Sequence, residues 1–212
     1  MTFFDKKESR TISAPELHLP AYRRGVKPTY MTYPSLPVNN HLYYITATIC
    51  GWKPIFEEQI YTQIILDSFT WLSESKACRL FAFVVMPTHT HFLIFPEAKS
   101  ISSITHSFGS FTAHQILKQL ETDERHDLLE FFKCQVVNPT HRHRIWQDIQ
   151  AENIFTVEFA QQKMEYIHQN PARGENPLVT CRSDYLYSSA CYYDYGKEPI
   201  IPVDDIREFL ST

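Results

Sequence analysis

The most strongly patterned part of the chain is a pair of apolar runs on either side of Pro87-Thr88. Residues 80–86 are almost wholly aromatic or aliphatic, which predicts a strand buried on both faces. Residues 89–95 predict a returning strand that begins with two histidines. Proline cannot donate a ladder hydrogen bond, so it suits the turn between the two strands. Because side chains alternate along a strand, we expect His89 and His91 on the same face.

Four further elements are predicted from the spacing of apolar side chains. Residues 42–49 are rich in β-branched and aromatic side chains, which predicts a strand. Apolar residues three and four positions apart predict amphipathic helices over residues 55–73, 100–120 and 156–169. Asn170-Pro171 should end the last helix, because the residue before a proline disfavours helical geometry.

The order of these elements predicts an α+β fold. Short strands are expected over residues 131–137 and 144–147, and one of them would complete a ferredoxin-like βαββαβ palm with an antiparallel sheet. The helix over residues 156–169 then follows the palm. Residues 1–38 show no sustained period and are interpreted as an irregular N-terminal lead-in, which leaves residues 39–212 as one domain with a C-terminal extension.

Composition narrows the classes of function. The chain has 212 residues, 43% of them hydrophobic, which is enough to bury a full core. It has only five glycines and no G-x-x-x-x-G-K-[ST] or G-x-G-x-x-G string, which argues against a P-loop or Rossmann nucleotide site. The net charge of −4 counts against an extended nucleic-acid surface, although a local basic patch remains compatible with it.

Cysteine usage and hydropathy bear on the compartment. The five cysteines are widely spaced without a C-x-x-C pair, which favours free thiols over a disulfide framework or a cysteine-rich zinc site. The N-terminus carries no apolar signal segment, and no apolar run approaches the length of a membrane span. We therefore expect a soluble cytoplasmic protein with no membrane partner.

The residues best suited to chemistry are the histidine pair and part of the late helix. Neutral imidazole is the commonest metal ligand, and the amide oxygen of Asn170 suits Mg²⁺ or Mn²⁺. Tyr166 lies four residues before Asn170, so a helix presents both on one face. A phenol near a metal can act as a nucleophile. The alternatives, two surface histidines and a tyrosine at the edge of the core, remain open at this point.

Four motifs, taken in order, resemble the single-tyrosine HUH transposases and most closely their REP-associated tyrosine transposase branch. The motifs are Val85-Met86-Pro87-Thr88-His89-Thr90-His91-Phe92-Leu93-Ile94, Arg144-Ile145-Trp146-Gln147, Tyr166-Ile167-His168-Gln169-Asn170-Pro171 and Tyr187-Ser188-Ser189-Ala190. The similarity runs over residues 42–193. It implies that residues 39–212 are an HUH transposase-like catalytic domain, with a ferredoxin-like palm and a C-terminal helix carrying the tyrosine.

The resemblance also implies a reaction. The family's tyrosine attacks a phosphate of single-stranded DNA, which gives a 5′-phosphotyrosine link and a free 3′-hydroxyl. Carried over by motif, the catalytic nucleophile is Tyr166, and the ligands of a divalent metal, Mg²⁺ or Mn²⁺, are His89, His91 and Asn170. The expected function is a DNA transposase, an endonuclease and strand transferase that cuts and rejoins single-stranded DNA at hairpin or repeat ends.

Alternatives to this function and to its assembly stay open. A domesticated descendant would bind DNA hairpins without cleaving them. A metal-dependent phosphodiesterase using water would keep its activity after the substitution Tyr166→Phe. The expected partner is single-stranded or hairpin DNA, and both a homodimer and a monomer are compatible with the sequence.

Basic residues outside the motifs are candidate DNA contacts, with solvated loops as the alternative. These residues are Arg23, Arg24, Lys27, Arg142, Arg144 and Arg173. A second His-x-His, His141-Arg142-His143, lies in a polar loop and lacks the strand context of the first, so a phosphate contact suits it better than a metal site.

Overall fold

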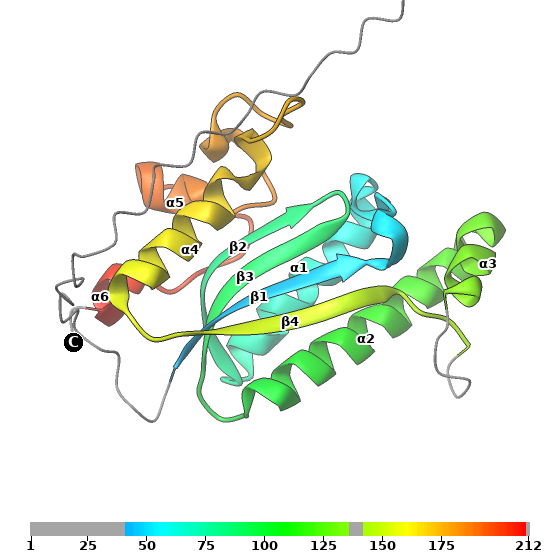
Figure 1. Ribbon diagram of the computed structural model, residues 1–212, viewed down its shortest axis with the longest axis horizontal. Helices are drawn as coiled ribbons and strands as arrows, with labels where there is room; N and C mark the ends of the chain where they lie inside the picture. Colours follow the sequence, from blue (N-terminus) through cyan, green and yellow to red (C-terminus); the bar gives the residue numbers. More distant parts are fainter. Residues whose placement is uncertain (1–40, 136–141, 211–212) are drawn as a thin grey trace, which may run out of the picture. The chain divides into compact units, whose positions relative to one another are not determined.

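The computed structural model describes residues 41–135 and 142–210. The predicted lead-in, with its basic residues Arg23, Arg24 and Lys27, lies outside the described residues, as does His141. The described part contains a four-stranded antiparallel sheet in the order β2-β3-β1-β4 (Figure 1). Its strands are β1 (Leu42–Ile49), β2 (Cys78–Met86), β3 (His89–Pro96) and β4 (Trp146–Ile154). This is the strand order of a ferredoxin-like palm, so the predicted α+β fold is confirmed.

Helices lie on both faces of this sheet (Figure 1). They are α1 (Gln59–Glu74), α2 (Ile101–Thr122), α3 (His126–Cys134), α4 (Val157–Gln169), α5 (Ala190–Tyr195) and α6 (Ile206–Leu210). Helices α1 and α2 pack on one face, and α4 packs on the other against β2 and β3. Within residues 41–135 and 142–210, no helix combines the length and apolarity that crossing a membrane requires.

Alternation along the strands divides the core between the two faces. In β1, Ile45, Ala47 and Ile49 join the larger cluster beneath α1 and α2, whereas Leu42 and Tyr44 join the smaller cluster beneath α4. Every residue of the predicted strand 80–86 is buried, as its apolar run indicated. Full burial of one large apolar side chain contributes roughly 1.5–3 kcal/mol to stability, so both clusters hold their helices firmly.

Helix α2 lies close to the edge strand β4. A Cβ atom built on Gly109 would lie 2.6 Å from Cδ1 of Ile149, so only glycine fits without a shift at this contact. Trp146 Nε1 donates a hydrogen bond of 3.0 Å to Thr112 Oγ1 on the same helix. These contacts fix the start of β4, the strand that completes the palm.

Two boundary predictions and one element prediction are wrong. In the described part of the strand expected over 131–137, the chain forms α3 up to Cys134, because Leu128 and Phe132 lie four residues apart and are buried together on one helix face. Residues 136 and 137 lie outside the described residues. The strand expected over 144–147 begins instead at Trp146 and runs to Ile154. Helix α1 starts at Gln59, because the segment Ile55–Glu57 after Pro54 forms a separate 3₁₀ turn.

The C-terminal segment closes the outer edge of the sheet at β2. Val85 N donates to Tyr187 O at 2.9 Å, and Ser189 N donates to Phe83 O at 3.1 Å. The hydroxyl of Tyr193 also donates to Phe81 O at 2.9 Å. The segment thus satisfies backbone groups that an open edge would expose.

Candidate functional site

The two histidines of β3 lie on the same face of the sheet, as alternation predicted, and the structure shows that α4 covers this face. Their ring centroids lie 4.7 Å apart. His91 is 4% exposed and His89 is half-buried. In the antiparallel register, Thr46 and Thr48 of β1 lie opposite His91 and His89. The pair therefore sits on the central strands, where neighbouring strands restrict its rotamers.

His91 is held by two hydroxyl groups of β1. Its Nδ1 lies 2.7 Å from the Tyr44 hydroxyl and 2.9 Å from Thr46 Oγ1. Burial lowers the pKa of His91 to about 3, and the charges of His89 and Lys163 act in the same direction. The ring is therefore neutral at physiological pH. Both contacts are made at Nδ1, which leaves Nε2 as the nitrogen that can face a ligand.

His89 links β3 to the end of α4. Its Nδ1 lies 2.9 Å from Thr88 Oγ1, and the side chain of Asn170 hydrogen-bonds its ring. Burial lowers the pKa of His89, and the Asn170 contact offsets part of this shift. The predicted third ligand, Asn170, is thus beside the first.

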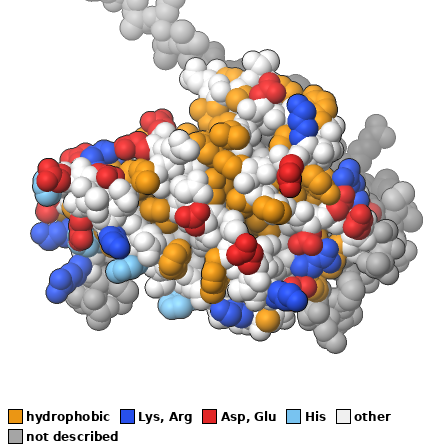
Figure 2. All heavy atoms as spheres, turned by 180° about the vertical axis from the view of Figure 1, so that it is seen from behind, with side chains coloured by type: hydrophobic (Ala, Val, Ile, Leu, Met, Phe, Trp, Pro, Cys, Tyr) orange, Lys and Arg blue, Asp and Glu red, His pale blue; other side chains and the backbone are white. Residues whose placement is uncertain are grey.

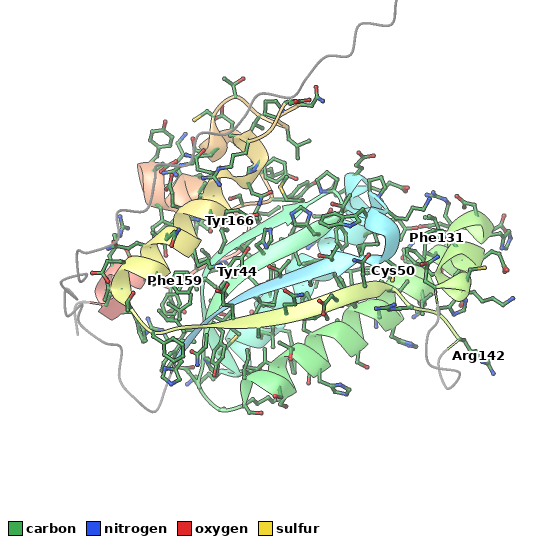
Figure 3. All side chains as sticks on the ribbon, in the orientation of Figure 1. Tyr44, Cys50, Phe131, Arg142, Phe159 and Tyr166 are labelled. Atoms are coloured by element: carbon green, nitrogen blue, oxygen red, sulfur yellow. The ribbon has the colours of Figure 1, made fainter. Side chains whose placement is uncertain are left out.

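Tyr166 comes from α4 and lies over the histidine pair. Its ring centroid is 5.3 Å from that of His91 and 6.2 Å from that of Tyr44, edge to face in both cases. Figure 3 shows Tyr166 on α4 beside Tyr44 on the sheet. Tyr166 remains 40% exposed, so a substrate can reach it. The four predicted site residues, His89, His91, Tyr166 and Asn170, come together within one chain.

Contacts from the C-terminal segment fix the rotation of α4. Buried His168 lies with its Nε2 2.9 Å from Ser189 Oγ, and that serine accepts a hydrogen bond from Phe83 N on β2. One turn from His168, Glu165 pairs with Arg182 at 2.5 Å. Arg182 also forms a two-pronged pair with Asp194. Since His168 and Glu165 are fixed on their side of the helix, Tyr166 is held facing the sheet.

The donor set of this site fits a divalent cation. Two neutral imidazoles and an amide oxygen are ligands that Mn²⁺ and related ions accept in combination. Among the described residues no three His, Cys, Asp or Glu side chains gather at one point, so a third protein ligand here has to be of another type, such as Asn170. All three groups are uncharged, which would leave the full charge of a cation for a phosphate.

The three predicted basic contacts that the structure describes, Arg142, Arg144 and Arg173, do not gather around this site. The guanidinium of Arg173 lies 5.5 Å from the Tyr166 ring centroid, directly over the ring. Arg144 donates to Trp146 O and so holds the start of β4. Arg142 is exposed near α3, at the other end of the sheet from Tyr166 (Figure 3). Of the three arginines in described segments, Arg173 is the one beside the tyrosine.

The opposite side of the molecule carries mixed charge. Figure 2 shows acidic and basic side chains interspersed there, with hydrophobic side chains between them. Exposed apolar residues of α1 and α2, such as Trp71 and Phe111, contribute to the surface of the described part. On the face that Figure 2 draws, the Lys and Arg side chains among the described residues are separated by acidic and apolar ones and form no continuous basic track of the kind that follows a DNA backbone.

Three site residues were not singled out from the sequence. Tyr44 and Thr46 hold His91, and Lys163 lies with its Nζ 4.3 Å from the Tyr44 ring centroid. Alternation places Tyr44 and Thr46 on one strand face, and Lys163 precedes Tyr166 by three residues on the helix. The sequence shows these spacings, but it does not show the strand register that brings β1 beside β3, so it could not assign these residues to the site.

Comparison with known proteins shows the fold. No protein-family model and no curated protein matches this sequence. A candidate transposase from Deinococcus radiodurans R1 aligns at 13% identity and a TM-score of 0.39 over 62% of this chain and 91% of its own. A REP-associated tyrosine transposase bound to a REP hairpin aligns at 19% identity and a TM-score of 0.53 over 89% of this chain and 93% of its own. The chain therefore has the fold of a REP-associated tyrosine transposase.

Proposed function

We propose that this protein is a REP-associated tyrosine transposase, a metal-dependent enzyme that cuts and rejoins single-stranded DNA at hairpin or repeat ends. The observation that carries the proposal is the packing of Tyr166 against His91, with ring centroids 5.3 Å apart, in a chain that also brings His89 and Asn170 together. A shared fold with a transposase solved on a REP hairpin supports DNA hairpins as the substrate class.

His89, His91 and Asn170 are the residues that would hold the metal, Mg²⁺ or Mn²⁺. When bound, the cation would polarise the scissile phosphate and neutralise charge that develops on it. Tyr44 and Thr46 keep the His91 ring in one orientation, and Thr88 does the same for His89. The protein thereby supplies a preorganised set of neutral ligands.

Tyr166 is the nucleophile in this proposal. A bond forms between its Oη and the phosphorus while the bond from phosphorus to the 3′-oxygen breaks, and the attacking and leaving oxygens lie roughly in line. The phenolic proton passes to solvent, which reaches this 40%-exposed side chain, and the 3′-oxygen takes up a proton to become a hydroxyl. The guanidinium of Arg173, over the Tyr166 ring, is close enough to contact the same phosphate.

Rejoining is the reverse exchange. A 3′-hydroxyl of a second strand attacks the phosphotyrosine, a phosphodiester forms, and the Tyr166 phenol is restored. One phosphoester bond replaces another in each step, so no nucleotide co-substrate is needed.

Incubation with hairpin oligonucleotides from the repeats flanking the gene tests the proposal. Wild type, Tyr166→Phe and Tyr195→Phe are compared on a denaturing gel with Mn²⁺, with Mg²⁺ and with chelator. Tyr195 is a matched control because it is an exposed tyrosine on α5 and lies outside the site. We expect a metal-dependent covalent band in wild type and Tyr195→Phe that is absent from Tyr166→Phe.

Two results would contradict the proposal, and each would favour a different function. Cleavage that survives Tyr166→Phe would indicate a phosphodiesterase that uses water. Hairpin binding without cleavage in any of the three proteins would indicate a DNA-binding protein that does not turn over its ligand.

A further inference from the structure

A cavity of about 350 Å³ shares Tyr166 with the proposed site, and its other lining residues take no part in the bond making of the proposed reaction. We name it the aromatic pocket; its walls are Tyr44, Phe159, Gln162, Lys163 and Tyr166. The four residues from α4 share one helix face because they lie three and four positions apart. Figure 3 shows Phe159 and Tyr166 on α4, with Tyr44 next to them on the sheet.

Contacts of Lys163 with neighbouring side chains hold the walls of the aromatic pocket in place. Lys163 Nζ lies 4.3 Å from the Tyr44 ring centroid and 5.1 Å from that of Phe159. The same ammonium group forms a 2.5 Å ion pair with Glu152, which lies opposite Tyr44 on β4. These contacts hold aromatic rings and one positive charge in fixed positions at the edge of the metal-ligand set.

This combination of groups suits an unpaired nucleobase. Every base has a π-face that stacks on aromatic rings, and a glutamine amide can hydrogen-bond a base edge with its donor and its acceptor. The cavity volume falls within the range of small-molecule sites, so a single base fits. The ammonium of Lys163 adds attraction for the adjoining phosphate.

In-line geometry decides which nucleotide reaches the pocket. The oxygen expelled by Tyr166 belongs to the nucleotide on the 5′ side of the scissile phosphate, and it leaves on the side away from the tyrosine. The nucleotide on the 3′ side stays linked to Tyr166. The tyrosine is itself a wall of the cavity, so the retained nucleotide is the nearer of the two.

We propose that the aromatic pocket binds the base of the nucleotide on the 3′ side of the scissile phosphate and so selects the position of cleavage. This inference rests on the proposed function. Phe159 stacks on the base, Gln162 contacts its edge, and Lys163 attracts the backbone. Phe159 and Gln162 are binding residues in this account and take no part in bond making.

The test combines single abasic sites with pocket variants. Cleavage by wild type first maps the scissile phosphate of the hairpin oligonucleotide. Binding of that oligonucleotide is then measured by fluorescence anisotropy in a Tyr166→Phe background, which prevents reaction. Oligonucleotides that lack one base at each position near the cleavage point are compared on the background protein and on Phe159→Leu, Gln162→Ala and Phe111→Leu.

A matched control is available on the opposite face of the sheet. Phe111 is an exposed aromatic residue on α2, so Phe111→Leu removes the same ring far from the pocket. Phe159→Leu keeps apolar volume beneath α4, and Gln162 is exposed, so neither change should prevent folding. Thermal melts of each variant check this directly.

We expect one abasic position, immediately 3′ of the scissile phosphate, to weaken binding roughly 5- to 100-fold. Phe159→Leu should weaken binding of the intact oligonucleotide and have no further effect on that abasic one. The inference would be overturned if the losses of binding from Phe159→Leu and from an abasic site were additive at every position, or if Phe159→Leu were coupled to the base on the 5′ side. Neither result would affect the proposed function as long as wild type still formed the covalent band. Absence of that band would instead overturn the proposed function.

Discussion

At the scale of single residues, two hydroxyl groups decide how His91 can bind a cation. The Tyr44 hydroxyl and Thr46 Oγ1 both lie within 3 Å of its Nδ1, at 2.7 Å and 2.9 Å. A metal on Nε2 requires the tautomer with a proton on Nδ1, and that N–H then donates to one of these oxygens. Burial raises the pKa of Tyr44, so its hydroxyl stays protonated and uncharged.

The double substitution Tyr44→Phe with Thr46→Val should lower affinity for Mn²⁺ roughly 10- to 100-fold, the usual effect of removing partners that orient a metal ligand. Calorimetric titration of the DNA-free protein with Mn²⁺ measures it. Tyr43→Phe is the matched control, because Tyr43 packs against the larger hydrophobic cluster on the other face. Equal affinity in all three proteins would show that the hydroxyls do not orient His91.

The site residues differ in how far the sequence could predict them. Alternation along a strand was enough to place His89 and His91 together, and four-residue spacing was enough for Tyr166 and Asn170. Joining the two pairs needed a tertiary contact between α4 and β3, which the sequence indicated only through the resemblance of its motifs. Tyr44, Thr46 and Phe159 depend on strand register and helix rotation, which a single sequence does not specify.

At the scale of elements, α4 is the part that brings nucleophile and metal ligands together. Its first turn is capped by Thr156, whose side chain accepts from Phe159 N, and its last turn ends at Asn170 beside His89. Buried His168 ties the helix to the C-terminal segment through Ser189. Loosening this contact would release Tyr166 and Asn170 together.

The free energy of unfolding should decrease as the pH is lowered, because His168 is buried as a neutral ring. Burial lowers its pKa in the native state from 6.5 to about 4, so between these values the unfolded chain binds the additional proton. Its contribution is complete above pH 6.5 and is lost as the pH falls toward 4, by about 2 kcal/mol between pH 7 and pH 5. Urea unfolding at both pH values measures this loss.

The matched variant is His168→Gln, which cannot become charged. It should show a pH-dependent loss about 2 kcal/mol smaller than wild type, while His91, whose pKa is also lowered, contributes equally in both proteins. An unchanged pH dependence in His168→Gln would contradict the account of His168.

Prediction succeeded for long periodic elements and failed where two periods compete. The β1, β2 and β3 strands and the α2 and α4 helices follow patterns that burial of one or both faces dictates. Over residues 131–137, aromatic and β-branched side chains predict a strand, but in the described residues up to Cys134 burial of Leu128 with Phe132 selects a helix. Strand β4 is mostly polar and exposed along an edge, so hydrophobic pattern could not give its length.

At the scale of the whole molecule, one chain supplies every candidate site residue. Tyr166 meets His91 within the same polypeptide, and the C-terminal segment holds α4 on its own sheet through His168 and Arg182. The fold is shared over 89% of the chain with a protein of only 19% identity, because the same layers of helices and sheet need matching burial patterns rather than matching residues.

Two inactive variants should therefore fail to rescue each other. A mixture of Tyr166→Phe with His89→Ala/His91→Ala is expected to form no covalent band with a hairpin oligonucleotide on a denaturing gel. Wild type diluted to the same concentration, alone and with either variant, is the control. A band from the mixture would mean that α4 of one copy completes the site of another.

The most direct test of the central claim is mass spectrometry of protein that has reacted with a hairpin oligonucleotide and Mn²⁺, after digestion by trypsin and nuclease. The account predicts one modified peptide, which contains Tyr166 and carries a nucleotide joined through its 5′-phosphate. A nucleotide on a different residue, or cleaved DNA with every peptide unmodified, would contradict it.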